Sequence, residues 1–207
     1  DPKQHVNPDR FRVKGYYSKH TGKYVKDSVG NIAQSNILGY FDRKDRNGDS
    51  KYDKIPCRTT AFTRDNVEEW TEVVPLFCEM DQLFKKLTPD KHKKQKLRAH
   101  MTDYVINDTA FSTITINYNW RTALHKDTGD FQDGFGNLVV LEEGSYEGGY
   151  TGFPQYKIAV DVREGDFLAM DVHQWHCNTE IKSKSEDYTR LSIVAYLREK
   201  MIICKKS

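Results

Sequence analysis

The 207-residue sequence predicts an α+β protein in which helices come first and a β-sandwich or jelly-roll follows. Three observations lead to this fold class. Residues 1–55 are rich in turn-forming residues, residues 65–98 show helical periodicity, and beyond residue 110 short β-branched and aromatic runs alternate with Gly and Asp turns. The length suits one domain, so we expect a single domain over 1–207, with a loop-rich and helical flank at 1–109 and the jelly-roll core at 110–207.

Two helices are expected in the flank. Apolar side chains recur at intervals of three, four or seven residues over 65–86, on one stripe of a helix: Val67, Trp70, Val74, Phe77 and Phe84. Pro75 lies inside this segment and should kink or divide the helix, because proline lacks the N–H that a helix needs. A second helix is expected to begin at Thr88, where Pro89 suits the first turn.

The core is expected to consist of short strands, because β-branched and aromatic residues cluster in runs bounded by turn residues. An isolated strand is also expected in the flank, at 37–41. The runs in the core are 113–118, 138–141, 157–162, 167–171 and 190–197. Strands of this length and spacing favour a sandwich or jelly-roll.

The composition describes a folded chain whose charges nearly balance. Hydrophobic residues make up 37% and aromatic residues 12%, which excludes wholesale disorder. The net charge is only +2, so attraction to nucleic acid would have to come from local clusters. Residues 85–98 form such a cluster, with seven Lys or Arg against a single acid. A surface that follows phosphates and an ordinary solvated helix face both fit this segment.

Cysteine usage and hydropathy indicate the compartment. The four cysteines are far apart and form no CxxC pair, so we expect reduced thiols: Cys57, Cys78, Cys177 and Cys204. No apolar run approaches the ~20 residues that span a bilayer, and the N-terminus has no signal pattern. We therefore expect an intracellular protein without a membrane partner, in the nucleus, or in the host cytoplasm if it comes from a virus or bacterium.

A small set of side chains indicates a metal site. His125 and Asp127 form an HxD triplet, whose spacing puts both side chains on one face of an extended segment. The expected strand at 167–171 then leads to His173 and His176, either of which can supply a third ligand. Two histidines and a carboxylate leave three adjacent metal positions open, the arrangement that non-haem Fe(II) oxygenases use. The same ligands also suit zinc in a hydrolase.

Arg190 separates these two interpretations. It opens the last expected strand, and Ser192 lies on the same face of that strand. A planar guanidinium can pair bidentately with the far carboxylate of a dicarboxylic co-substrate such as 2-oxoglutarate, for which a hydrolase has no need. A surface ion pair is the ordinary alternative for this arginine. The ordered set of HxD, distal His and RxS favours the oxygenase.

The same segments resemble the TET/J-binding-protein family of nucleic-acid 5-methylpyrimidine hydroxylases, over roughly residues 37–200. The matching motifs are PCRTTAFT at 56–63, RTALHKDTGDF at 121–131, PQY at 154–156, VDVREGD at 160–166, DVHQWHCN at 171–178 and RLS at 190–192. The resemblance implies a double-stranded β-helix core that uses Fe(II), 2-oxoglutarate and O2. It also implies oxidation of the 5-methyl group of a pyrimidine in DNA, with 5-methylcytosine favoured and thymine next.

The resemblance assigns roles to the metal-site residues. The implied iron ligands and co-substrate arginine are His125, Asp127, His176 and Arg190. His176 is preferred to His173, because the family places this ligand five residues after an aspartate such as Asp171. Ser192 and Asn117 are expected to help hold the co-substrate. Asp130 has three possible roles: it could orient His125, contact a bound small molecule or cap the turn at Gly129.

The base itself needs a pocket, because a base inside duplex DNA is out of reach and must be flipped out. The candidates for contacting it are Arg58, Thr59, Asn117, Asn119 and Trp175. Each has an ordinary structural alternative. Two other functions stay open: a hydroxylase of the same class acting on a nucleoside or protein, and a non-catalytic jelly-roll that binds modified bases. The chain is expected to be a monomer.

Overall fold

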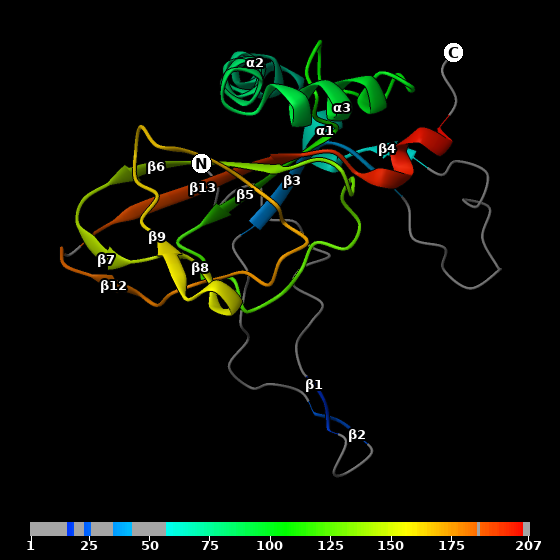
Figure 1. The fold of residues 1–207 in the computed structure, drawn as a ribbon. Helices are drawn as coiled ribbons and strands as arrows, with labels where there is room; N and C mark the ends of the chain where they lie inside the picture. Colours follow the sequence, from blue (N-terminus) through cyan, green and yellow to red (C-terminus); the bar gives the residue numbers. More distant parts are fainter. Residues whose placement is uncertain (1–15, 19–22, 26–34, 43–56, 186, 205–207) are drawn as a thin grey trace.

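A six-stranded antiparallel sheet forms the centre of the molecule, with helices on one face and smaller sheets on the other (Figure 1). The computed structural model describes residues 16–18, 23–25, 35–42, 57–185 and 187–204. In spatial order the central strands are β10 (Phe167–Met170), β6 (Gly136–Glu143), β13 (Thr189–Tyr196), β5 (Thr113–Tyr118), β3 (Ser35–Asp42) and β4 (Cys57–Thr59). The expected strands at 37–41, 113–118, 138–141, 167–171 and 190–197 are therefore confirmed, with small shifts at their ends.

The smaller sheets are built from short strands on the face away from the helices. A three-stranded sheet has the order β11 (Cys177–Asn178), β8 (Thr151–Phe153) and β9 (Ile158–Val160), and β12 (Ile181–Ser183) pairs with β7 (Tyr146–Gly148). A separate hairpin joins β1 (Tyr16–Ser18) to β2 (Lys23–Val25), and two short 3-10 helices are η2 (Pro154–Tyr156) and η3 (Glu199–Ile203). These layers confirm the predicted α+β jelly-roll. The extent of the domain over 1–207 stays a prediction.

The helical layer contains α1 (Ala61–Asp65), α2 (Val67–Leu87) and α3 (Pro89–Ala99). Phe77 and Phe84 of the expected stripe are buried in the core, whereas Val67 is 61% exposed, so the stripe was wrong at its first member. Pro75 does not divide α2. It lies on the exposed side of the helix, where water can bind the carbonyl that lost its N–H partner. Within the described residues, none of the helices is long and apolar enough to cross a bilayer.

Strand β13 serves both faces of the central sheet. Ile193 and Ala195 belong to the apolar core under the helices, together with Phe77 and Phe84. The alternate residues Arg190, Ser192, Val194 and Tyr196 line a cavity on the opposite face. This is the two-residue period of a β-strand, and it separates the part of the strand that stabilises the fold from the part that faces the cavity. Helix α3, which carries five of the seven basic residues of the 85–98 cluster, belongs to the helical layer, on the face of the central sheet opposite to the smaller sheets.

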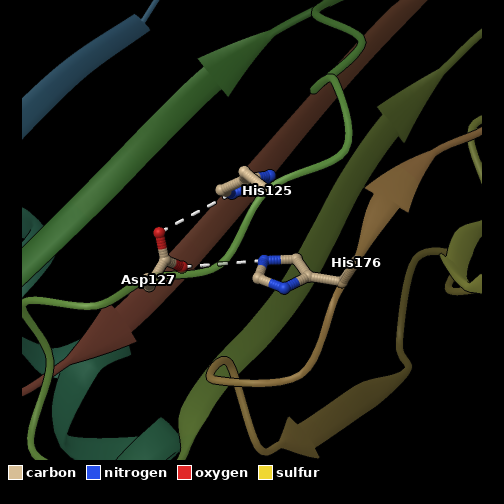
Figure 2. Close-up of side chains that lie close together, drawn as sticks. All are labelled: His125, Asp127 and His176. Atoms are coloured by element: carbon tan, nitrogen blue, oxygen red, sulfur yellow. Dashed lines mark ion pairs between the residues drawn. The ribbon is translucent and has the colours of Figure 1, made fainter. Parts of the chain in front are cut away.

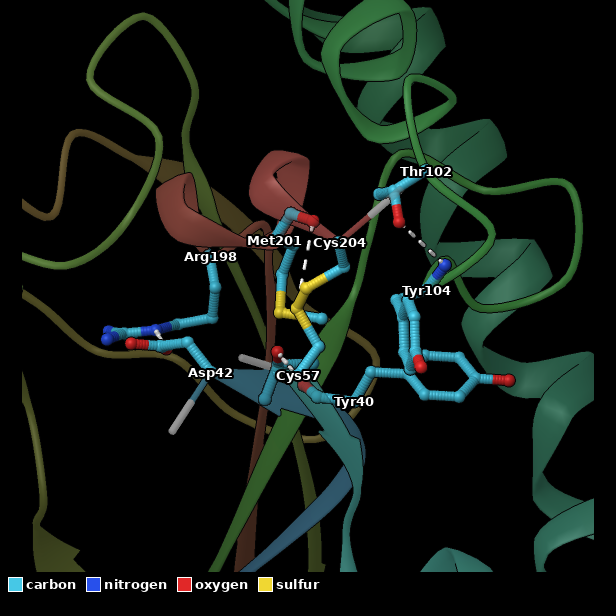
Figure 3. Close-up of a disulfide and its surroundings, with 9 residues drawn as sticks. Tyr40, Asp42, Cys57, Thr102, Tyr104, Arg198, Met201 and Cys204 are labelled. Carbon is cyan, nitrogen blue, oxygen red and sulfur yellow. Dashed lines mark hydrogen bonds and ion pairs between the residues drawn. A yellow bond between two sulfur atoms is a disulfide. The ribbon is translucent and has the colours of Figure 1, made fainter. Parts of the chain in front are cut away.

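A disulfide ties the edge of the sheet to the C-terminal segment (Figure 3). Cys57 of β4 is bonded to Cys204, with Cα atoms 6.0 Å apart, and both cysteines are buried beside Met201. The expectation of four reduced thiols is therefore wrong for this pair, since spacing in the sequence says nothing about which cysteines the fold brings together. Cys78 and Cys177 remain free.

We expect thiol titration of the unfolded chain, purified without reductant, to detect two free thiols, those of Cys78 and Cys177. Reduction should lower the free energy of unfolding by about 2–5 kcal/mol, because the bridge closes a loop of 147 residues in the unfolded chain. Urea denaturation with and without dithiothreitol measures this difference, and the Cys57→Ser variant is the control that should not respond. Four titratable thiols in the untreated protein would contradict the disulfide.

Candidate active site

A cavity of about 260 Å³ lies between the central sheet and the smaller sheets. Strands from both layers line it, including β13 and β5 on one side and β8 and β11 on the other. Many of the residues expected at the site meet here: Asn117, His125, Asp127, Asp130, His176, Arg190 and Ser192. Side chains from widely separated segments therefore line the same cavity.

His125, Asp127 and His176 converge in this cavity (Figure 2). The Nε2 atom of His125 lies 3.6 Å from Oδ1 of Asp127, and the Nε2 atom of His176 lies 3.6 Å from Oδ2 of the same carboxylate. Both separations exceed the length of a hydrogen bond. Each of the three residues offers one possible metal-ligand atom, and these atoms lie within 4.8 Å of one another. A single ion can therefore contact all three residues.

Backbone pairing between two segments sets this geometry. His125 and His176 exchange two backbone hydrogen bonds of 3.0 Å, as an isolated antiparallel bridge. The N–H of Asp127 donates to the carbonyl of Val172 at 3.0 Å, and the N–H of Asn178 donates to the carbonyl of Thr122 at 3.0 Å. The HxD segment is therefore held against the segment of the distal histidine by the main chain, independently of any ion.

The two histidines present the same ring nitrogen to the site. Nδ1 of His125 donates to the carbonyl of Ala123 at 2.7 Å, and Nδ1 of His176 donates to the carbonyl of Gln174 at 2.9 Å. A carbonyl oxygen can only accept, so Nδ1 carries the proton and Nε2 keeps a free lone pair in the neutral ring. Burial lowers the pKa of His176 below the ordinary histidine value, which favours the neutral, ligating form.

His173, the alternative third ligand, has both ring nitrogens engaged elsewhere. Its Nδ1 lies 3.0 Å from Oδ1 of Asp171, and its Nε2 lies 3.2 Å from the carbonyl oxygen of Asp130. Asp171 also accepts a hydrogen bond from the backbone N–H of His173. These bonds give His173 a role in holding the loop that precedes His176, and the geometry favours His176 as the ligand.

Arg190 is a buried cation with unused hydrogen-bonding capacity. Its side chain lines the cavity, although the residue is only 2% exposed, and burial lowers its pKa below the ordinary arginine value. Nη2 donates to the carbonyl of Gly149 at 3.2 Å, while Nε has no protein partner. Ser192 and Asn117 are neighbours in the cavity wall, with Nδ2 of the amide 3.4 Å from Oγ of the hydroxyl. A buried cation with an orphaned N–H is suited to an anionic ligand.

Asp130 forms a second polar group in the cavity wall, with Arg198. Nη1 of Arg198 lies 3.3 Å from Oδ1 of Asp130, and Nε of Arg198 lies 2.7 Å from Oδ1 of Asp42. Burial and the nearby Asp127 raise the pKa of Asp130 to about 8, against the opposing effect of Arg198. The Nδ1 atom of His125 is bonded to the carbonyl of Ala123 and Asp130 accepts from Arg198, so the role of Asp130 stays a prediction, with contact to a bound small molecule favoured by its place in the cavity wall.

Four residues expected to contact a base lie outside the cavity lining. Arg58 and Thr59 are in β4 at the edge of the central sheet, and Trp175 is an exposed side chain. The side chain of Asn119 is bonded to the main chain at the start of β13: its Oδ1 accepts from the backbone N–H of Arg190 at 2.6 Å, and its Nδ2 donates to the carbonyl of Tyr188 at 2.9 Å. Its φ of 46° is a left-handed conformation that asparagine tolerates better than most residues.

We expect Asn119→Ala to lower the free energy of unfolding by about 1–3 kcal/mol, because it removes two hydrogen bonds to the main chain and leaves a strained backbone. Asn119→Gly should lose less, since glycine adopts positive φ freely. Chemical denaturation of both variants measures the difference. Unchanged stability in Asn119→Ala would show that these two bonds do not stabilise the fold.

The cavity also contains residues that the sequence interpretation missed: Trp120, Thr122, Thr151, Asn178, Tyr196 and Arg198. Tyr196 and Arg198 continue the alternation that begins at Arg190 and Ser192, so the period of the strand could have found them. The other four lie in loops or in strands of two or three residues, which are too short to show a period.

These features define a metal-dependent oxygenase of the jelly-roll class. Two imidazole nitrogens and a carboxylate fit Fe(II), and the buried guanidinium of Arg190, which is not fully hydrogen-bonded within the protein, fits the distal carboxylate of 2-oxoglutarate. The chain belongs to the Tet_JBP family, the oxygenase domain of the 2OGFeDO superfamily, which it matches over residues 36–199. That superfamily uses Fe(II), 2-oxoglutarate and O2, so the chain is an Fe(II)/2-oxoglutarate-dependent dioxygenase domain.

Known proteins similar to this chain include two from Trypanosoma brucei brucei. The chain is 35% identical over 190 residues to the bifunctional helicase and thymine dioxygenase JBP2, covering 90% of this chain and 17% of that protein. It is 38% identical over 167 residues to thymine dioxygenase JBP1, covering 79% of this chain and 19% of that protein. The chain thus spans less than a fifth of the length of these relatives.

Among solved structures, NgTET1 in complex with 5mC DNA has a similar fold. The TM-score is 0.61 at 13% sequence identity, over 84% of this chain and 65% of that one. At this identity the similarity establishes the architecture and leaves the substrate to other evidence.

Proposed function

We propose that this chain hydroxylates the 5-methyl group of thymine in DNA, with His125, Asp127 and His176 holding Fe(II) and Arg190 holding 2-oxoglutarate. The observation that carries the proposal is the meeting of a His/Asp/His cluster and a buried, partly unpaired arginine in one cavity. Fe(II), when bound there, supplies the activation of O2 that the oxidation of a methyl group requires.

The choice of base rests on the relatives. Those that are 35–38% identical to most of this chain are named thymine dioxygenases, whereas the likeness to a structure with 5mC DNA is one of fold at 13% identity. Thymine therefore takes the first place that the sequence resemblance gave to 5-methylcytosine. 5-Methylcytosine remains the second candidate.

The residues of this chain position the reactants. Arg190 lines the cavity and is not fully hydrogen-bonded within the protein, so its guanidinium can bind the distal carboxylate of 2-oxoglutarate, with the Ser192 hydroxyl on the same strand face. Asp130 and Arg198 form the polar wall near Asp127, and they offer hydrogen-bond acceptors and donors to the edge of a flipped base. The remaining cavity wall includes apolar side chains such as Met170 and Val194, which limit the entry of water.

The test combines purified protein with Fe(II), 2-oxoglutarate and oligonucleotides that contain thymine, 5-methylcytosine or neither methylated base. Mass spectrometry of the digested DNA should detect 5-hydroxymethyluracil, with succinate formed in proportion. Product from 5-methylcytosine alone would reverse the order of the two bases. Product from a nucleoside or peptide but not DNA, or DNA binding without any product, would replace the proposal by one of the two other functions. Light scattering on the same sample tests the expected monomer.

A further inference from the structure

Trp175 is a large aromatic side chain that is 45% exposed and lies next in sequence to His176, one of the three candidate metal ligands. It directly precedes His176 but lies outside the cavity lining. Lys126 stands between His125 and Asp127 in the chain, and its Nζ lies 5.2 Å from the centroid of a Trp175 ring. Two side chains that flank the candidate metal ligands therefore meet on the outside of the site, where neither can help to hold the ion.

A second exposed aromatic borders the same segment. Tyr156 of η2 is 55% exposed, and its hydroxyl donates to Oε1 of Gln174 at 2.9 Å. The side-chain amide of Gln174 donates in turn to Oδ2 of Asp171 at 2.8 Å, so the position of Gln174 is fixed from two sides. We call the group Lys126, Tyr156, Gln174 and Trp175 the aromatic rim. Exposed aromatic surface beside a cationic side chain is costly to leave in water and is typical of sites that bind single strands.

We propose that the aromatic rim binds the DNA strand next to the base that enters the cavity, with Trp175 stacking on a neighbouring base and Lys126 pairing with a phosphate. This rests on the proposed function. Flipping one base out of the duplex leaves its neighbours without a stacking partner, and an indole ring can supply the lost contact whatever the sequence.

The ammonium group of Lys126 lies over the indole ring of Trp175 and can be displaced from it. Among the described residues Lys126 forms no ion pair with a carboxylate, and its Nζ lies over Trp175 in a cation–π contact of 5.2 Å. Such a contact at an exposed site contributes only about 0.5–1 kcal/mol. A phosphate can therefore draw the ammonium group away and expose the ring face to a base, which couples the two contacts.

The experiment measures the affinity of the 207-residue chain for a fluorescein-labelled, thymine-containing duplex by anisotropy. Trp175→Ala should weaken binding at least about fivefold, the effect of losing one stacked base. Trp175→Phe should recover most of the affinity, because a phenyl ring still stacks. Lys126→Met should reduce the slope of log affinity against log salt by about one, whereas the exposed Lys200→Met on η3 should leave affinity unchanged. DNA should also quench tryptophan fluorescence in the wild type and less in Trp175→Phe.

The outcomes separate the rim from the proposed function. If the wild type neither binds nor oxidises DNA, the proposed function and the proposed role of the aromatic rim are both overturned. If the wild type oxidises thymine while Trp175→Ala binds DNA as tightly as the wild type, only the rim is overturned. A loss of Fe(II) affinity in Trp175→Ala equal to its loss of DNA affinity would also overturn the rim, because it would show that the variant acts by displacing His176.

Discussion

Asp127→Ala is expected to abolish oxidation of DNA and to weaken Fe(II) binding at least about a hundredfold. The carboxylate lies between the two imidazoles and is the only anionic member of the cluster in the described residues. Removing even an outer partner of a metal ligand costs 10–100-fold in metal affinity, so loss of a ligand itself should cost no less. The backbone hydrogen bond from Asp127 to Val172 does not depend on the side chain, so the fold should survive.

Anaerobic titration of Fe(II) and succinate formation measure the two effects separately. Asp133→Ala is the matched control, because this exposed aspartate lies in the same stretch of chain but outside the cavity lining. Undiminished metal affinity in Asp127→Ala would remove this residue from the ligand set.

Arg190→Lys is expected to raise the KM for 2-oxoglutarate by about 30-fold or more. Losing one partner of a buried, hydrogen-bonded charge pair costs about 2–5 kcal/mol, and an ammonium group cannot reproduce the two parallel N–H bonds of a guanidinium. The kcat at saturating 2-oxoglutarate should fall much less, because the substitution weakens the binding of 2-oxoglutarate and leaves the three candidate metal ligands unchanged.

Arg64→Lys on α1 is the control, since its guanidinium pairs with Asp65 on the surface and lies outside the cavity. Thermal unfolding of Arg190→Lys checks that the variant is folded. An unchanged KM would show that Arg190 only supports the fold through Gly149.

The sequence predicted the elements of this protein better than the details of its site. Strand β5 was found at its observed bounds, and the α2–α3 boundary was placed correctly by Thr88 and Pro89. Spacing within one strand or helix carries this information directly. Residues such as Arg190 and Ser192 were found for the same reason, because alternation along a strand determines which side chains share a face.

Contacts made by tertiary pairing were harder to predict. Trp175 was expected to contact the base, but it lies outside the cavity that His176 lines, because adjacent residues of an extended segment point to opposite sides. The pairing of Cys57 with Cys204 joins residues near the two ends of the fold. Asn119 carries an amide that suits a base equally well, and only the structure shows its bonds to the main chain at the start of β13.

The two-sided use of β13 restricts how this protein can change. Ile193 and Ala195 pack in the apolar core, and the even-numbered residues from Arg190 to Tyr196 line the cavity. Inserting or deleting one residue within the strand would exchange the two faces, turning Arg190 toward the helical layer and Ile193 toward the cavity. We therefore expect an insertion or deletion inside β13 to disturb both the core and the cavity, whereas a single substitution changes only one of them.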